Sequence, residues 1–203
     1  MPVRLEGKPD DPDFIWMRQQ PASFESPLAE PERVLEALGL EAEDRAPDLP
    51  LQAGSTGVPF LYVPLRDGEA VDRARMDERA YQMALGEPEH TPGAFIFAPE
   101  NDGGEHRVYS RMLGTSSLGV GEDPATGSAS GPLGAYLVKE GVFAPDQEGR
   151  TRVISEQGTK MGRQSFVSIT VSDTDSAGNG GGLIEVGGAT VPVLEGRLRL
   201  GRG

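Results

Sequence analysis

The fold is decided by the stretch GEDPATGSASGPLGAYLVK, residues 121–139. Acids, a proline, hydroxyls and glycines come first, and small or apolar residues follow on nearly every side of a helical projection. Thr126 and Ser128 are candidate helix caps and Gly141 is a usual helix end, so we expect a helix near residues 127–140. A helix that is apolar nearly all round is usually buried, so this one should lie at the centre of the fold.

The start of this helix is also a candidate binding site. The first N–H groups of a helix lack partners within it, and the helix dipole leaves partial positive charge there, so a carboxylate or phosphate is favoured. Thr126, Gly127 and Ser128 would supply those donors. The residues alone equally allow a simple turn, in which Asp123 accepts hydrogen bonds from its own backbone.

The remaining sequence predicts mostly short strands. Apolar, alternating or β-branched runs predict strands at residues 14–17, 60–63, 94–98, 106–112, 151–154, 164–172, 183–186, 189–193 and 197–200. Amphipathic spacing predicts a helix at residues 30–38 and a surface helix at residues 70–85. Strands on both sides of one apolar helix predict an α+β fold, with a curved sheet wrapped around that helix.

The composition limits the function. A net charge of −13 over 203 residues argues against nucleic acid or an anionic membrane as partner, because both require basic surface. No apolar run approaches the ~20 residues that span a bilayer. No signal peptide is visible. The simplest expectation is a cytoplasmic protein.

The absence of cysteine excludes thiol nucleophiles, disulfides and cysteine-containing zinc sites. The two histidines, His90 and His106, are too few and too far apart in sequence to predict a metal site, and we expect surface or edge-strand roles for them. No metal and no cofactor are therefore expected. Acid–base chemistry would depend on carboxylates, helped by hydroxyls.

Four blocks of sequence, in order, resemble the phenazine-biosynthesis PhzF-like isomerases of the diaminopimelate-epimerase-like superfamily. The signature is EDPATGSA at residues 122–129, and the other blocks are STGVPF at 55–60, EQG and MGRQS at 156–158 and 161–165, and VGGA and GRL at 186–189 and 196–198. The resemblance runs from about Phe14 to Leu200 and corresponds to the C-terminal two-thirds of the family. Arg111–Thr115 departs from it, because relatives more often have an aromatic residue, a small residue and proline there.

The resemblance implies two similar domains, each a curved mixed β-sheet around a central helix, with the active site between them. Residues 1–50 would be a remnant of the first domain with a linker, residues 51–190 the C-terminal domain, and residues 191–203 a closing strand that can return to the first domain. The family's N-terminal segment, with its proton-shuttle glutamate and Gly-His turn, has no counterpart here. We expect that this part was lost, that the start is misplaced, or that another chain supplies it.

The resemblance also implies the site. Asp123 would line the cleft, bind the substrate and pass a proton, while Gly127 and Ser128, with Thr126, would hold a substrate carboxylate. The facing turn of the same domain would be formed by Ser55, Thr56 and Gly57. The two-thiol mechanism of diaminopimelate epimerases and proline racemases is excluded, because the chain has no cysteine.

Two functions from different classes follow. The first is a cofactor-independent isomerase or epimerase of a small amino or hydroxy carboxylic acid; the family's namesake acts on a dihydro-hydroxyanthranilate. The second is a non-catalytic protein that binds a small carboxylate or dimerises, because the shuttle glutamate is missing. A nucleotide-binding role lacks the glycine fingerprints that would support it. A homodimer is expected, because a domain without its usual partner exposes an apolar face.

Overall fold

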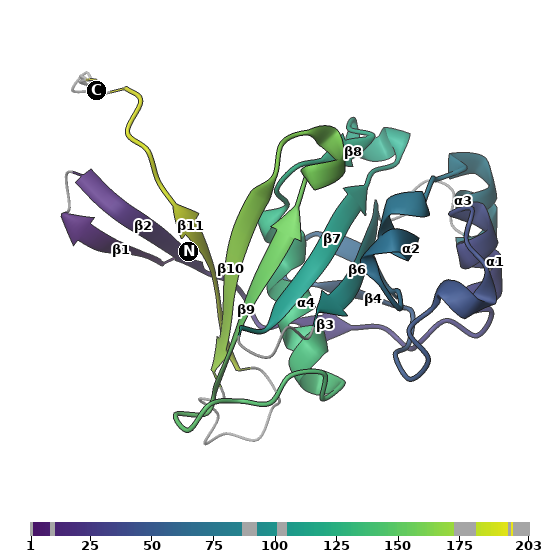
Figure 1. Cartoon of the computed structure of the whole chain (residues 1–203), viewed down its shortest axis with the longest axis horizontal. Coiled ribbons are helices and arrows are strands. Elements are labelled where there is room, and N and C mark those ends of the chain that lie inside the picture. The colour runs from purple at the N-terminus through teal and green to yellow at the C-terminus, as the bar shows by residue number, and fades with distance from the viewer. Residues whose placement is uncertain are drawn as a thin grey trace, which may run out of the picture.

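The computed structural model describes residues 2–8, 11–86, 93–100, 105–172, 182–194 and 196. Its strands form a single mixed sheet in the order β1-β2-β11-β10-β9-β7-β6-β5-β4-β3, with the short β8 paired to β7 (Figure 1). The pairs β5–β6 and β7–β9 are parallel, and the other pairs are antiparallel. The expected α+β class is confirmed.

The helices and strands are spread along the whole described chain. The strands are β1 Val3–Lys8, β2 Asp11–Arg18, β3 Ser23–Phe24, β4 Gln52–Ser55, β5 Pro59–Pro64, β6 Gly93–Glu100, β7 Arg107–Leu113, β8 Glu122–Asp123, β9 Arg150–Gln157, β10 Ser165–Ser172 and β11 Leu183–Ala189. The α-helices are α1 Pro31–Ala37, α2 Gly68–Arg73, α3 Glu78–Leu85 and α4 Gly127–Lys139, and short 3₁₀ turns occupy Ala42–Asp44, Ser116–Leu118 and Thr159–Met161.

The sheet curves around α4, which is buried as the sequence predicts (Figure 1). Leu133, Tyr136 and Leu137 are fully buried and pack against side chains from β5, β6, β7, β9, β10 and β11. Two helix glycines allow this close packing. A Cβ on Gly134 would lie 2.5 Å from Ile169 Cγ2, and one on Gly131 would lie 2.0 Å from the side chain of Gln19.

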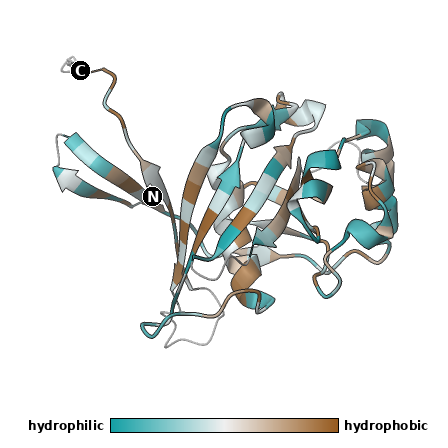
Figure 2. Cartoon of the chain, viewed as in Figure 1, coloured by the Kyte–Doolittle hydropathy of each residue, from teal (hydrophilic) through white to brown (hydrophobic). Residues whose placement is uncertain are grey.

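A second apolar layer covers the other face of the central strands. Along β5 the side chains alternate: Phe60 and Tyr62 face α4, whereas Leu61 and Val63 face α1, α2 and α3. Strands β5 and β6 are therefore buried on both faces, whereas β10 is buried on one. Figure 2 shows hydrophobic and hydrophilic residues alternating along β10, as that one-sided burial requires.

The prediction of one continuous surface helix at residues 70–85 is wrong, because two helices form there. The backbone of Ala74 is extended and ends α2, while Asp77 caps the start of α3. Between them the N–H groups of Arg75 and Asp77 donate to the carbonyls of Leu38 and Ala37, each at 2.8 Å. These bonds to the end of α1 replace the helical hydrogen bonds, and spacing within one helix cannot reveal them.

The ends of the sheet come from distant parts of the chain. Strands β1 and β2 form a hairpin that stands away from the body on the side opposite α1, α2 and α3 (Figure 1), whereas β3 forms the other end. β11 stops at Ala189, and residues 190–194 form no strand, so a strand at 189–193 does not form. The strand predicted at 197–200 lies outside the described residues. The division into domains at residues 50 and 190 stays a proposal.

Candidate active site

Asp123 is held at the start of α4 by a buried ion pair beside it. Arg111 on β7 is 4% exposed, and its guanidinium donates to both carboxylate oxygens of the neighbouring Glu122, at 2.8 and 2.9 Å. Its Nη1 also donates to the carbonyls of Val71 and Ala74, at 2.9 and 3.1 Å. The hydrogen bonds to Glu122 hold the pKa of Arg111 above its ordinary value. Arg111, which departs from the family pattern, thus links β8 to the end of α2.

A buried glutamine fixes the turn between β8 and α4. Gln157, at the end of β9, donates from Nε2 to the carbonyl of Asp123 at 2.6 Å and to Thr126 Oγ1 at 2.9 Å. Its Oε1 accepts the Thr126 N–H at 3.1 Å. Thr126 Oγ1 in turn donates to Asp123 Oδ2 at 2.6 Å. The carboxylate is therefore oriented by one hydroxyl, which Gln157 in turn holds in place.

Thr126 is the N-cap residue of α4, as expected, but its hydroxyl makes no capping hydrogen bond to the helix. That hydroxyl is used by Asp123 and Gln157 instead. The backbone N–H groups of Gly127 and Ser128, and the Ser128 hydroxyl, have no hydrogen-bond acceptor among the described residues. Both residues are partly exposed. Their three donors are therefore without a partner in the described chain at the start of α4, four and five residues after Asp123.

A second buried glutamine joins the two turns that the sequence singled out. Gln19, which follows β2, donates from Nε2 to the carbonyl of Gly127 at 2.8 Å. Its Oε1 accepts from Thr56 Oγ1 at 2.6 Å. The turn at residues 55–57 and the start of α4 are thereby linked, although they are far apart in sequence.

The other two residues of the facing turn have local roles in the structure. Ser55 Oγ accepts the backbone N–H of Gly57 at 2.8 Å, which closes the turn. Gly57 has φ = 149°, a backbone conformation that favours glycine. Among the described residues the Ser55 side chain makes no hydrogen bond to α4, and Gly57 has no side chain. Thr56 is therefore the member of this turn that reaches the site, through Gln19.

Sequence reasoning missed both glutamines. Gln157 lies inside the EQG block, which was a usable signal, whereas nothing in the sequence around Gln19 distinguishes it from a surface residue. His106, by contrast, lies far from this turn and packs edge-to-face on Phe143, with ring centroids 4.5 Å apart. His90 lies outside the described residues.

Other chemistries find little support in the part of the chain that the structure describes. No group of three or more histidine, aspartate and glutamate side chains there is arranged to hold a metal ion. Nor does any helix within the described ranges have both the length and the apolar character needed to cross a membrane. The arrangement at α4 can bind an anionic group through three donors and present one oriented carboxylate to it.

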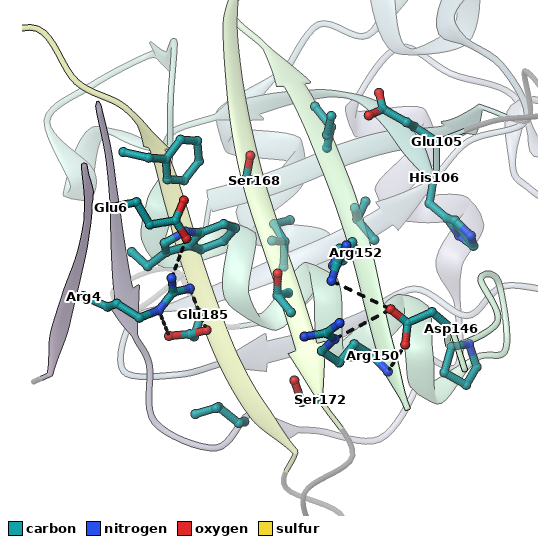
Figure 3. Close-up of a pocket in the computed structure, with 18 of the residues that line it drawn as sticks. Arg4, Glu6, Glu105, His106, Asp146, Arg150, Arg152, Ser168, Ser172 and Glu185 are labelled. Carbon is teal, nitrogen blue, oxygen red and sulfur yellow. Dashed lines mark hydrogen bonds and ion pairs between the residues drawn. The ribbon is translucent and has the colours of Figure 1, made fainter. Parts of the chain in front are cut away.

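A groove of about 1080 Å³ lies elsewhere, on the outer face of β9, β10, β11 and the β1–β2 hairpin. Figure 3 shows two charged groups on its walls: Arg4 with Glu6 and Glu185, and Asp146 with Arg150 and Arg152. None of the candidate site residues lines this groove. Its arginines Arg4, Arg150 and Arg152 are paired with carboxylates, so the groove does not compete with α4 as an anion site.

A sequence profile of the phenazine biosynthesis-like protein family (PhzC-PhzF) matches residues 1–196. The chain belongs to this family. An uncharacterized isomerase, YddE, of Escherichia coli K12 is 32% identical over 171 residues, which cover 83% of this chain and 56% of that protein. The trans-2,3-dihydro-3-hydroxyanthranilate isomerase of Pseudomonas aeruginosa is 29% identical over 182 residues, or 90% of this chain and 58% of that protein.

A solved structure supports the same fold. The Bacillus anthracis phenazine biosynthesis protein of the PhzF family superposes with a TM-score of 0.76 at 25% identity, covering 92% of this chain and 60% of that one. The epimerase-like fold expected from the sequence is confirmed. The chain spans little more than half the length of these relatives, and their activities belong to the whole proteins.

Proposed function

We propose that this chain is a PhzF-like, cofactor-independent isomerase or epimerase that acts on a small amino or hydroxy carboxylic acid by carboxylate-mediated proton transfer. The observation that carries the proposal is the turn at α4, where the oriented carboxylate of Asp123 lies beside the free donors of Gly127 and Ser128. A site of this kind can hold one end of a carboxylic acid and exchange a proton with a neighbouring atom.

The donors define the binding step. A substrate carboxylate would accept hydrogen bonds from the N–H groups of Gly127 and Ser128 and from the Ser128 hydroxyl. The helix dipole adds favourable charge at this end of α4. We expected Thr126 to bind the carboxylate as well, but its hydroxyl is occupied by Asp123 and Gln157, so its role would be to position Asp123. Ser55, Thr56 and Gly57 would shape the facing wall.

Asp123 would carry the chemistry. The neighbouring Glu122 is engaged by Arg111, which leaves Asp123 as the available carboxylate of this turn within the described chain. A single carboxylate suffices to take a proton from one carbon and deliver it to another carbon on the same face of the substrate, which is an isomerisation. Epimerisation would need a second group on the opposite face. The Pseudomonas aeruginosa relative, a trans-2,3-dihydro-3-hydroxyanthranilate isomerase, supports a cyclic amino acid with a hydroxyl group as the first substrate to try.

The second function is a non-catalytic protein that binds a small carboxylate. It uses the same donors and needs no proton transfer. The hydrogen bond from Thr126 Oγ1, which already occupies Asp123 Oδ2, favours it. A homodimer, a cytoplasmic location and the absence of nucleic-acid and membrane partners remain parts of the first proposal.

Deuterium exchange separates the two functions. The protein is incubated in deuterium oxide with trans-2,3-dihydro-3-hydroxyanthranilate and with other small amino and hydroxy acids, and carbon-bound deuterium is followed by NMR. We expect exchange with the native chain, none with Asp123→Asn, and a raised KM with Ser128→Ala. Met83→Gln, an exposed change on α3, is the matched control. No exchange, together with a carboxylate-induced rise in Tm, would establish the binding function instead.

A further inference from the structure

The side-chain amide of Gln157 can take only one orientation. Its Oε1 lies 3.1 Å from the backbone nitrogen of Thr126, whose N–H can only donate, and its Nε2 lies 2.6 Å from the carbonyl oxygen of Asp123, which can only accept. A flipped amide would place donor against donor and acceptor against acceptor. Because Gln157 is fully buried, such unpaired groups would be strongly unfavourable, so the flipped amide is excluded.

This orientation decides the direction of the Thr126 hydroxyl group. Gln157 Nε2 donates its second hydrogen to Thr126 Oγ1 at 2.9 Å, and an amide nitrogen cannot accept one in return. The single hydrogen of the hydroxyl is thereby left for Asp123 Oδ2, which lies 2.6 Å from Oγ1. The hydrogen bonds therefore run from Gln157 through Thr126 to Asp123 and cannot be reversed.

The two carboxylate oxygens of Asp123 are consequently not equivalent. Oδ2 accepts the Thr126 hydrogen, whereas no residue that the structure describes donates to Oδ1. A proton added to Oδ2 would displace the Thr126 hydrogen from its bond. A proton added to Oδ1 leaves every hydrogen bond of the network in place, so Oδ1 is the oxygen that can gain and lose a proton without rearrangement.

The residue after Gln157 lets the end of β9 approach this turn closely. A Cβ on Gly158 would lie 2.9 Å from the carbonyl oxygen of Pro124 and 2.3 Å from that of Arg163, so a larger residue would push β9 away from the turn. The φ of Gly158, +79°, also favours glycine. The short reach of the Gln157 side chain therefore depends on the backbone contact beside it.

We propose that Gln157, acting through Thr126, is a positioning residue that reserves Oδ1 of Asp123 for the substrate proton. The inference rests on the proposed function and names the oxygen that would perform it. A C–H bond of the substrate breaks, its proton passes to Oδ1, and its electron pair stays on the substrate. The new O–H bond then breaks and the proton forms a C–H bond at a second carbon, so the product is an isomer and no co-reactant is needed.

Two variants break the network at different points. Thr126→Val replaces the hydroxyl by a methyl group, and Gln157→Glu places an oxygen where Nε2 lies, which draws the Thr126 hydrogen away from Asp123. Each should lower kcat for deuterium exchange about tenfold or more, because the carboxylate is then free to rotate. KM should stay within about twofold, since the donors of Gly127 and Ser128 are unchanged. Thr126→Ser keeps the hydroxyl and should restore kcat.

The rotamer of Asp123 gives a readout that needs no turnover. Three-bond couplings between its Hα and Hβ protons, measured by NMR, show whether the side chain holds one rotamer. We expect the values of a single rotamer in the native chain and in Thr126→Ser, and averaged values in Thr126→Val. Thr151→Val, the same exchange at another buried threonine, on β9, is the matched control and should keep both the rotamer and kcat.

Binding of anthranilate, a carboxylate without an acidic C–H bond, separates positioning from a general loss of structure. Thr126→Val and Gln157→Glu should retain the rise in Tm that anthranilate produces in the native chain. Loss of that rise together with kcat, or an averaged Asp123 rotamer in the native chain, overturns the inference.

The exchange rates also distinguish this inference from the proposed function. A native chain that catalyses no exchange rejects the proposed function and, with it, the assignment of Oδ1. A native chain that exchanges no faster than Thr126→Val and Gln157→Glu overturns the positioning role of Gln157 and leaves the proposed function standing.

Discussion

The turn at the start of α4 and the β1–β2 hairpin are held in opposite ways. The turn is fixed by side chains from distant strands, with Gln157 and Gln19 buried and Arg111 supporting the strand before it. The hairpin touches the body along β11, and every residue of β1 is exposed. The candidate chemistry thus lies on a turn that several distant side chains fix, whereas β1 pairs only with β2 among the described strands.

The largest expected effect is at the buried charge behind the turn. Arg111→Met leaves Glu122 without its cation and two carbonyls without their donor, and should lower the free energy of unfolding by about 3–5 kcal/mol. Urea unfolding measures it. Arg33→Met is the control, since its exposed pair with Glu30 should contribute about 1 kcal/mol or less. Equal losses in both variants would mean that the ion pair behind the turn stabilises the protein no more than an exposed ion pair does.

Packing around α4 gives the next effect. In Gly134→Ala the new Cβ would lie 2.5 Å from Ile169 Cγ2, and we expect a loss of about 1–3 kcal/mol despite the better helix propensity of alanine. Gly127→Ala is the matched control, because its Cβ would meet only Val186 Cγ1, at 4.0 Å. In thermal unfolding, Gly134→Ala should have a lower Tm than Gly127→Ala. The reverse order would mean that the sheet is not closed tightly on α4.

A smaller effect is expected at the cap of α2, which supports Arg111. Asp67 Oδ1 accepts the Ala70 N–H at 2.8 Å, and Asp67→Ala should cost about 1 kcal/mol at neutral pH. The hydrogen bond from Ala70, and then the one from Arg66, lower the pKa of Asp67. Its contribution is therefore present above the ordinary pKa of about 3.9 and lost as the pH falls through the lower folded value.

Urea midpoints at neutral and acidic pH test this direction of pH dependence. The difference in midpoint between the native chain and Asp67→Ala should shrink in acid. Asp67→Asn can still cap the helix without a charge, so its stability should depend less on pH than that of the native chain. A gap that widens in acid would contradict the assigned cause.

The smallest effect belongs to the hairpin. Val3→Thr changes an exposed side chain on an exposed strand and should alter the free energy of unfolding by about 0.5 kcal/mol or less. Chemical denaturation at a concentration below that of self-association measures the single chain. A loss comparable to that of Gly134→Ala would mean that β1 packs on the body, and the contrast between the two regions would disappear.

The sequence predicted what neighbouring residues determine. The glycine-rich cap, the apolar helix and the end before Gly141 are all local signals, and α4 begins and ends within one residue of the expected range. The nearness of Asp123, Thr126, Gly127 and Ser128 follows directly from that helix start. Their spacing alone could suggest donors at this point.

The sequence could not predict the hydrogen bonds that form between residues far apart in the chain. Gln157 and Gln19 acquire their roles because β9 and β2 end beside the start of α4, which depends on the complete strand order. The break between α2 and α3 depends on carbonyls at the end of α1. Arg111 was noticed as a departure from the family, but its partners come from β8 and from the end of α2.

The strand order also has a consequence for synthesis of the chain. Arg18 of β2 pairs with Glu185 of β11, so β2 can dock on the body only after the chain has been made as far as β11. Contacts between such distant positions form slowly, and an unpaired strand edge is prone to wrong pairing meanwhile. The edge of β2 that faces β11 therefore stays open until β11 has been synthesised.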